Sequence, residues 1–444
     1  METYDLIRKK RDGRELSRAE IEHLISGFTQ GLIPDYQMAA FLMSVYFQGM
    51  TDQEGVDLCQ AMVDSGDRVD LSSIQGFKVD KHSTGGVGDT TTLVLAPLVA
   101  SCGGVVAKMT GRELGHTGGT VDKLESIPGM RTELSQEEFI RIANQVRVSL
   151  IAQTASLAPA DKKIYALRNV TATVDSLPLI AASIMSKKIA AGADGIVLDV
   201  KTGSGAFMPR YEDALALART MVRIGQGAGR RMTALITGME QPLGRAVGNA
   251  VEVQEAIETL GGAGPSDLKE LVLELGSEML LLSGAAEGRS QARARLEESL
   301  TKGKGLARLG RLIQAQGGRA EVIENPELLP QPRARIEARA GASGFVTAIN
   351  ALEVGMASKV LGAGRKTKDE GVDPSIGLIL LKKVGDEVTQ GEPLAILHSD
   401  GDQAKIKPAL ERLLKAYTLG EERVEPPRLF YARVGKDGIE ELAA

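Results

Sequence analysis

Two glycine-rich loops, separated by about one helix and one strand, constrain the fold of this chain more than any other feature. The first runs from Lys81 to Thr92 (KHSTGGVGDTTT) and the second from Lys108 to Thr120 (KMTGRELGHTGGT). Each follows a short apolar segment typical of a strand and leads into a segment typical of a helix. Loops at consecutive strand ends meet at one edge of a parallel sheet, so the pattern predicts an α/β fold with a site at that edge.

The side chains of both loops suit an anion. Glycine lets the backbone curl and bring its N–H groups close to a ligand, while lysine and hydroxyl groups complete a cage. A helix is expected from about Thr91, and its N-terminal amides favour a phosphate. The spacing fits neither the nucleotide P-loop nor the dinucleotide fingerprint. A lone glycine pair is more often an ordinary turn, but two such loops together indicate a phosphate site.

The composition narrows the class of protein. Glycine accounts for 51 of the 444 residues, aromatic residues for only 3%, and tryptophan is absent. This favours an α/β enzyme over a β-sandwich or a nucleic-acid reader that stacks bases on aromatic rings. The net charge is −5 with acids and bases interspersed, so no nucleic-acid partner is expected.

The cellular compartment is predicted from three kinds of feature that the sequence does not show: a signal peptide, a membrane span and a disulfide framework. The N-terminus is too polar for a signal peptide, and no apolar run approaches the ~18 residues of a membrane span, so no membrane partner is expected. Cys59 and Cys102 are the only cysteines, which fits a reducing interior without a disulfide framework. The cytoplasm is therefore the predicted location.

The pattern along the chain predicts the α/β class, with a helical domain interleaved with a larger α/β domain and a C-terminal α+β hammerhead-like domain. Capping boxes beginning at Ser17 and Thr51 each open an amphipathic helical run. The predicted boundaries are 1–70 and 159–192 for the helical domain, 71–158 and 193–330 for the α/β phosphate-binding domain, and 331–444 for the C-terminal domain.

The C-terminal pattern KxGDxVxxGxPL resembles the hammerhead turn of lipoyl and biotinyl carrier domains. A carrier would present a modifiable lysine in the next tight turn, but residues 398–403 read HSDGDQ. The absence of a lysine in this turn therefore predicts a structural role for the domain. It counts against the alternative that the chain is not an enzyme but a binding or carrier protein. An intact phosphate loop counts against it as well.

Four longer motifs resemble the thymidine/pyrimidine-nucleoside phosphorylase family. They are KHSTGGVGDTTT, GHTGGTVDKLESIPG, LAPADKKIYALRNVTATVDSLPLIAASIMSKK and DVKTGSGAFM, in this order. The resemblance covers nearly the whole chain. It implies phosphorolysis, in which inorganic phosphate attacks C1′ of a pyrimidine nucleoside and releases the free base and a (deoxy)ribose 1-phosphate. It also implies a homodimer that pairs through the helical domain, and no organic cofactor.

One departure from the family is visible in the second loop. Thr110-Gly111-Arg112-Glu113 stands where the family usually has Ser-Gly-Arg-Gly. The threonine keeps the hydroxyl, but Glu113 puts a carboxylate near a phosphate loop.

The resemblance also nominates site residues. The phosphate would be held by Lys81, His82, Ser83, Thr92, Lys108, Met109, Thr110 and Thr120. The pyrimidine base would be bound by Arg168, Ser183 and Lys187, and the catalytic residues would be His82, Arg168 and Lys187. A potassium ion would be held by Gly88, Thr90, Leu243, Ala246 and Glu255, whose oxygen atoms suit a hard cation.

Each of these residues also has a plainer interpretation. A single serine or threonine is more often a cap or turn residue, and the Lys187-Lys188 pair alone would suggest a solvated helix end. His82 is predicted to donate a hydrogen bond or a proton to the leaving base, although it could only shape its loop. His116 is a weaker candidate inside a tight turn, and His23 and His398 are expected on the surface.

The substrate range depends on one position. Thymidine-restricted relatives tend to carry methionine where this chain has Lys108, so the broad enzyme, acting on uridine, thymidine and deoxyuridine, is expected over a thymidine-restricted one. The other alternative is an anthranilate-type phosphoribosyltransferase, which would need an acidic pair for magnesium. The separation of base and phosphate residues along the chain further predicts that two domains close around the substrates.

Overall fold

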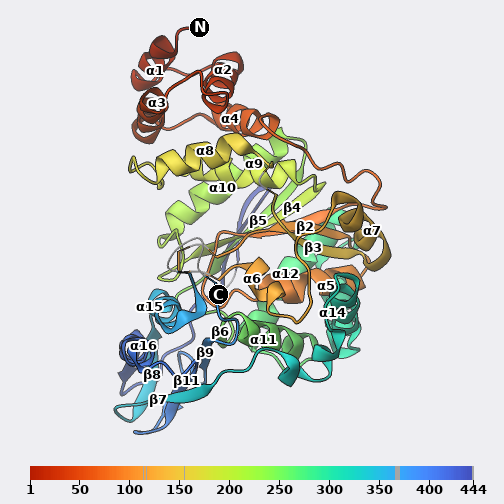
Figure 1. Cartoon of the computed structure of the whole chain (residues 1–444), viewed down its shortest axis with the longest axis vertical. Helices are drawn as coiled ribbons and strands as arrows, with labels where there is room; N and C mark the ends of the chain where they lie inside the picture. Colours follow the sequence, from red (N-terminus) through yellow and green to blue (C-terminus); the bar gives the residue numbers. More distant parts are fainter. Residues whose placement is uncertain (114, 117, 155, 366–370, 443–444) are drawn as a thin grey trace.

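Three regions follow one another along the longest axis of the molecule: a helical bundle, a central sheet with helices on both faces, and a region of small sheets (Figure 1). The computed structural model describes residues 1–113, 115–116, 118–154, 156–365 and 371–442. None of the helices in these ranges is long and apolar enough to cross a membrane.

The helical bundle combines two parts of the chain. Both predicted capping boxes are present, at Ser17 and Thr51. Helix α9 packs against α4, and α8 packs against α2, so a segment far along the chain completes the N-terminal helices. The bundle helices are α1 (Thr3–Arg11), α2 (Arg18–Thr29), α3 (Asp35–Gln48), α4 (Asp52–Asp64), α8 (Pro159–Arg168) and α9 (Leu177–Ala190).

The central sheet is parallel at its core. Strands β1 (Val79–Ser83), β4 (Gly195–Thr202) and β5 (Arg231–Gly238) pair in that order and in parallel. Strands β2 (Val106–Thr110) and β3 (Val148–Ala152) form a parallel pair of their own. The amide of Val79 donates to the carbonyl of Val105 at 2.9 Å, so β2 continues the sheet beside β1.

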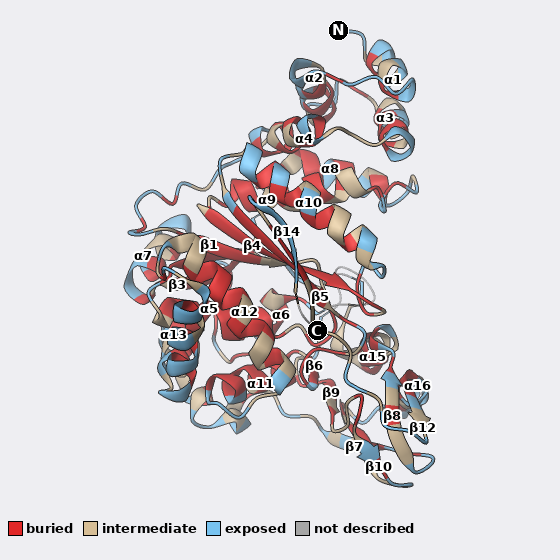
Figure 2. Ribbon diagram, turned by 180° about the vertical axis from the view of Figure 1, so that it is seen from behind, coloured by how far each residue is buried: buried red, intermediate tan, exposed pale blue. Residues whose placement is uncertain are grey.

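Alternate residues of the central strands face two separate cores. In β4, Ile196, Leu198 and Val200 pack toward the helical bundle, whereas Val197 packs toward the opposite layer. Figure 2 shows the strands buried between these two helical layers. Helix α10 (Tyr211–Gly227) packs on β4 and β5 and on the bundle helices α4 and α9.

The opposite layer consists of helices that pack on α5 and on one another. Helix α12 contacts α5 and strands β1, β4 and β5, while α14 contacts α5 and α7. Apart from α10, the described α-helices between the bundle and the C-terminal region are α5 (Thr91–Ser101), α6 (Thr120–Glu125), α7 (Gln136–Val146), α11 (Ala250–Leu260), α12 (Ser266–Ser283), α13 (Arg289–Thr301) and α14 (Lys304–Ala315).

The C-terminal region contains two small antiparallel sheets. One has the order β10-β8-β12, and the other has the order β6-β9-β11-β7. Helix α15 packs against α16. The elements are β6 (Ala246–Gly248), short helices at Ala320–Ile323 and Pro326–Leu328, β7 (Ala334–Arg339), β8 (Gly344–Ile349), α15 (Ala351–Ser358), a π-helical turn Lys359–Ala363, β9 (Gly377–Leu380), β10 (Glu387–Val388), β11 (Pro393–Ser399), α16 (Gln403–Ala416) and β12 (Tyr417–Gly420).

The structure departs from the sequence-based boundaries at two places. Strands β13 (Phe430–Gly435) and β14 (Gly438–Glu441), grouped by sequence with the C-terminal domain, extend the central sheet: β13 pairs antiparallel with β5, and β14 pairs antiparallel with β13. Conversely, β6, assigned by sequence to the α/β domain, pairs with β9 of the C-terminal region. Both exchanges cover strand edges that would otherwise expose unpaired backbone groups.

The prediction that His398 lies on the surface is wrong. His398 is on β11, which pairs with both β7 and β9, and its side chain is buried. Burial lowers its pKa to about 4, with a smaller effect from Arg335. The polar residues that follow His398 in sequence suggested a turn, whereas His398 itself is still part of the strand.

Candidate active site

The predicted phosphate residues gather at the carboxyl edge of the sheet. Lys81, His82 and Ser83 are the last three residues of β1, and Lys108, Met109 and Thr110 are the last three of the neighbouring β2. Thr92 lies in the first turn of α5 and Thr120 is the first residue of α6. Parallel strands with helices starting behind them bring all eight positions to one edge.

The carboxylate of Asp80 balances two buried ammonium groups at this edge. It accepts hydrogen bonds from Lys108 Nζ at 3.1 Å and from Lys188 Nζ at 2.9 Å. Burial alone would raise the pKa of Asp80, but the two ammonium groups outweigh it and lower that pKa to about 2. Burial lowers the pKa of Lys108 to about 7, against the pull of Asp80 and with the help of Lys188.

A second buried charge cluster lies beneath the first loop. The carboxylate of Asp199 is 3.0 Å from Lys81 Nζ and 2.9 Å from Lys201 Nζ, and it accepts a hydrogen bond from the hydroxyl of Thr237 at 2.6 Å. Burial would lower the pKa of Lys81, but Asp199 and Asp89 together raise it. Lys81 is therefore held charged at the bottom of the loop.

The two histidines of the loops differ in their surroundings. Burial, together with Lys188 and Lys108, lowers the pKa of His82 well below its ordinary value, so its imidazole is neutral near pH 7. His116 Nε2 lies 2.9 Å from the carbonyl oxygen of Gly205, and its ring packs on Phe207. His116 thus connects the second loop to the loop after β4. Leu114 and Thr117 of the second loop lie outside the described residues.

The predicted base-binding residues all lie on α8 and α9. Ser183 and Lys187 are one turn apart on α9, with Lys187 Nζ 3.4 Å from the Ser183 hydroxyl and 2.8 Å from Asp161 Oδ2. The Arg168 side chain is buried, and its guanidinium donates to the backbone carbonyls of residues 173, 174 and 179. A guanidinium has five N–H donors, and three of those of Arg168 are used by these carbonyls.

The residue after Lys187 connects this base-binding region to the phosphate loops. Lys188 is buried and donates both to Asp80 Oδ2 and, at 3.0 Å, to the carbonyl of Met109. The expectation of a solvated helix end at Lys187-Lys188 therefore fails for Lys188. The adjacent residues Lys187 and Lys188 of α9 therefore contact different parts of the candidate site: Lys187 the predicted base-binding residues, and Lys188 the strands β1 and β2.

The five residues nominated for potassium converge on one point behind the first loop. A Cβ atom on Gly88 would come within 2.3 Å of the Leu243 carbonyl oxygen and 3.0 Å of that of Ala246. Thr90 Oγ1 is 3.4 Å from Glu255 Oε2. Burial raises the pKa of Glu255 to about 8, as expected for a carboxylate that a cation would neutralise. Carbonyl, hydroxyl and carboxylate oxygens together fit a hard cation.

Several residues that organise the candidate site were not predicted from the sequence. They are Asp80, Asp161, Lys188, Asp199 and Lys201, and each is buried and engaged by an oppositely charged side chain. A signal was present, because charged residues interrupt otherwise apolar strands at VDK and LDVK. Buried charges are rarely tolerated unless they are paired.

Family models match three consecutive parts of the chain. The helical bundle domain of a glycosyl transferase family matches residues 4–66, the a/b domain of that family matches residues 75–306, and the pyrimidine nucleoside phosphorylase C-terminal domain matches residues 345–420. A pyrimidine-nucleoside phosphorylase of Staphylococcus haemolyticus is 57% identical over 400 residues, which cover 90% of this chain and 92% of the relative.

The chain belongs to the pyrimidine-nucleoside phosphorylase family. A pyrimidine-nucleoside phosphorylase of Staphylococcus aureus (strain USA300) is 54% identical over 426 residues, covering 96% of this chain and 98% of the relative. The predicted family and the predicted α/β class are thus confirmed.

The fold also resembles anthranilate phosphoribosyltransferase from Thermus thermophilus, with a TM-score of 0.58 over 70% of this chain and 99% of that chain. The two share 19% sequence identity, so this likeness shows the fold alone. The family matches favour a nucleoside phosphorylase over the alternative of an anthranilate-type phosphoribosyltransferase.

Proposed function

We propose that this phosphorylase-family protein cleaves pyrimidine nucleosides with inorganic phosphate, giving the free base and a (deoxy)ribose 1-phosphate. One observation carries the proposal: α9 presents Ser183 and Lys187 and accepts a hydrogen bond from Arg168 at Leu179, while the residue after Lys187, Lys188, bonds to Asp80 of β1 and Met109 of β2. Donors for a base and donors for a phosphate therefore meet across one helix.

The chemistry follows from this arrangement. A phosphate oxygen attacks C1′, the C1′–N1 bond breaks, and its electron pair passes to the pyrimidine. Lys81, kept charged by Asp199 and Asp89, and the amides at the start of α5 hold the dianion. Arg168 and Lys187 offer donors for the charge that develops on the leaving base, which is where stabilisation accelerates the reaction.

His82 acts as a neutral hydrogen-bond donor to the base O2. Its burial and the lysines around it keep the imidazole uncharged at neutral pH, and a neutral imidazole still has one N–H group that can donate. Its proton need not transfer fully, because the charge on the pyrimidine spreads over both ring oxygens and N3.

Uridine, thymidine and deoxyuridine are all proposed as substrates. Lys108, whose counterpart in thymidine-restricted relatives tends to be methionine, supports the broad range. Its ammonium lies between Asp80 and the backbone carbonyl of Lys81, at the end of the strand that leads into the phosphate loop.

Potassium is the proposed resident ion, held by Gly88, Thr90, Leu243, Ala246 and Glu255. Its charge would compensate the Glu255 carboxylate and fix the path of the first loop. Thermal unfolding in potassium compared with choline salts tests this: a higher midpoint in potassium is expected for the native chain and not for Glu255→Gln. Equal midpoints for the native chain in both salts would contradict the ion.

A homodimer that pairs through the helical domain is also proposed. Helix α3 carries Tyr36, Ala40, Met43 and Phe47 along one face, and Tyr36 and Phe47 are 75% and 76% exposed. An exposed apolar stripe of this kind suits contact with a second copy. The cytoplasm remains the proposed compartment, in keeping with free thiols at Cys59 and Cys102.

The decisive experiment is base release from uridine, thymidine and deoxyuridine, followed by ultraviolet absorbance with and without inorganic phosphate. Phosphate-dependent release from ribo- and deoxyribonucleosides is expected. Cleavage of deoxynucleosides alone would replace the broad substrate range with a thymidine-type one. No cleavage of any of the three would overturn the proposal, and ribosyl pyrophosphate with magnesium would be assayed next.

A further inference from the structure

Glu113, the residue at which the second loop departs from the family pattern, contacts the C-terminal region. Its carboxylate Oε1 accepts a hydrogen bond from the backbone amide of Arg365 at 2.6 Å. Its Oε2 atom lies so close to Gly364 that a Cβ atom there would come within 2.9 Å. The carboxylate introduced near the phosphate loop therefore packs against a segment 252 residues away in sequence.

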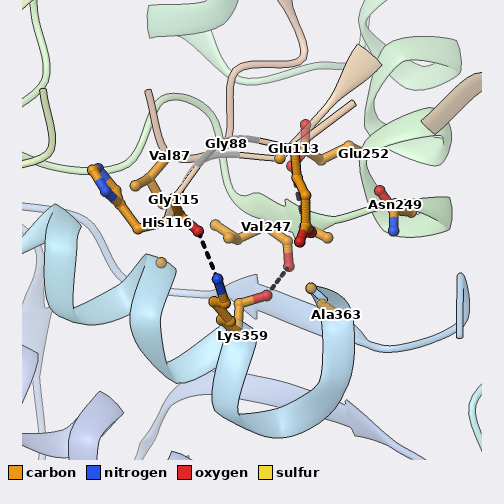
Figure 3. Close-up of a pocket in the computed structure, with 15 residues that line it drawn as sticks. Val87, Gly88, Glu113, Gly115, His116, Val247, Asn249, Glu252, Lys359 and Ala363 are labelled. Atoms are coloured by element: carbon orange, nitrogen blue, oxygen red, sulfur yellow. Dashed lines mark hydrogen bonds between the residues drawn. The ribbon is translucent and has the colours of Figure 1, made fainter. Parts of the chain in front are cut away.

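Three further contacts join the same two segments. Lys359 Nζ donates to the carbonyl of Gly115 at 3.0 Å, as Figure 3 shows. Arg365 Nη2 donates to Asp122 Oδ1 at 2.8 Å. Gly355 of α15 lies so close to the carbonyl of His116 that a Cβ atom would come within 2.8 Å. These contacts of the segment 355–365 with the second loop and with Asp122 of α6, together with those of Glu113, form a clasp.

A small cavity lies between these contacts, so the clasp is not part of a continuous core. The cavity is lined by both segments and by residues behind the first loop, including Glu113, His116, Asn249, Glu252 and Lys359 (Figure 3). Contacts around a cavity are few, and removing one of them loosens the loop more than it would in a packed interior.

Hydrogen bonds within the second loop connect these contacts to the proposed phosphate-binding residues at its two ends. The amide of Glu113 donates to Asp122 Oδ2 at 3.0 Å, and the amide of Val121 donates to the carbonyl of Gly111 at 3.2 Å. Gly111 follows Thr110, and Val121 follows Thr120. The backbone of the loop is therefore tied across its base, and the side chain of Glu113 ties it to the C-terminal region.

We propose that Glu113 is a positioning residue for phosphate: by joining the second glycine loop to Lys359–Arg365, it keeps Thr110 and Thr120 in the geometry that binds the anion. The inference rests on the proposed phosphorolysis. A glycine-rich loop loses much backbone entropy when it is ordered. The clasp offsets that loss on folding, so that phosphate does not have to order the loop when it binds.

The test compares four variants with the native chain: Glu113→Ala, Glu113→Gln, Lys359→Ala and the control Glu353→Ala. Glu353 also lies on α15, but its ion pair with Arg412 stays within the C-terminal region. Phosphate affinity is measured by calorimetry without nucleoside, and the KM values for phosphate and uridine are measured separately.

Glu113→Ala and Lys359→Ala are expected to weaken phosphate binding and raise its KM by about tenfold, a size typical of coupling between contacting segments. The KM for uridine should stay within about twofold. Glu113→Gln should keep most of the native affinity, because its amide oxygen can still accept from the Arg365 amide. The control should match the native chain.

Unchanged phosphate affinity in both Glu113→Ala and Lys359→Ala would overturn the inference. Equal increases in both KM values with a lower melting temperature would also overturn it, because they would indicate a merely structural role. If the native chain binds phosphate but releases no base, the proposed function fails, whereas the calorimetric comparison still decides the role of Glu113.

Discussion

Asp80 is the residue on which the two halves of the site depend for charge balance. It lies between Lys108 of β2 and Lys188 of α9, and all three side chains are buried. Removing the shared carboxylate would leave two ammonium groups in a region of low dielectric without compensation. Its position therefore matters for the fold as well as for the proposed phosphate site.

Asp80→Asn is expected to lower the free energy of unfolding by about 3–5 kcal/mol, the usual cost of breaking a buried pair. Urea denaturation measures the change. Asp64→Asn is a matched control, because its ion pair with Arg68 is exposed and should contribute less than about 1 kcal/mol. Equal effects of the two substitutions would contradict the assignment of Asp80 as the shared counter-ion.

Lys108 gives a pH dependence whose sign follows from its pKa of about 7, below the ordinary 10.5. Between these two values the unfolded chain holds a proton on Lys108 that the folded chain has released. The contribution of Lys108 to stability therefore increases as the pH rises through this window. Unfolding free energies of the native chain and Lys108→Met, measured from about pH 7 to about pH 9.5, should diverge in favour of the native chain. A constant difference would show that the pKa is not lowered.

At the scale of elements, β13 is fixed to the central sheet by one arginine. Arg433 is buried and lies 2.8 Å from Glu278 of α12, and it also pairs with Glu274 of the same helix. The strand is thus held both by backbone pairing with β5 and by charge pairing with the helix behind it.

Arg433→Ala is expected to destabilise the chain by about 3 kcal/mol or more, because it removes the buried cation shared by Glu274 and Glu278 and leaves the buried Glu278 with only the half-exposed Arg289 as a partner. Thermal or urea unfolding measures this, and release of β13 would expose the backbone edge of β5, which should also favour aggregation. Arg293→Ala, which removes two partly exposed ion pairs, with Glu270 and with Glu297, should change stability by less than about 1 kcal/mol. Wild-type stability of Arg433→Ala would argue against this anchor.

For the whole molecule, the apolar stripe on α3 predicts the state of association. Replacing both Tyr36 and Phe47 by glutamate would place charges across the proposed contact, which should convert a dimer into a monomer in analytical ultracentrifugation. Leu352→Glu, at a similarly apolar but distant position that is 37% exposed, should leave the dimer intact. A native chain that sediments as a monomer would contradict the pairing.

The helical bundle is also predicted to close on the α/β region when both substrates bind. The proposed base donors lie on the bundle and the proposed phosphate donors on the sheet, so substrates that contact both should draw the two regions together and exclude water. Small-angle scattering should show a smaller radius of gyration with phosphate and a nucleoside analogue together than with either alone. An unchanged radius would count against closure.

The positions of many residues of the candidate site could be predicted from sequence, because they depend on local patterns. Each glycine loop is contiguous, and a strand before it and a helix after it fix where Lys81, Ser83, Lys108 and Thr110 must lie. The capping boxes at Ser17 and Thr51 are equally local, and both are present. Short-range patterns determine such features because the interacting atoms are neighbours in the chain.

Only the tertiary structure decided how distant segments share partners. Asp80 meets Lys188 across 108 residues and Glu113 meets Arg365 across 252, and neither pairing leaves a periodic trace in the sequence. The same holds for β13 beside β5 and for the burial of His398, which depend on which strand edges meet. The sequence by itself determined the family, the α/β class and the loop chemistry, whereas charge pairing and edge pairing were decided by packing, because they depend on distances in space.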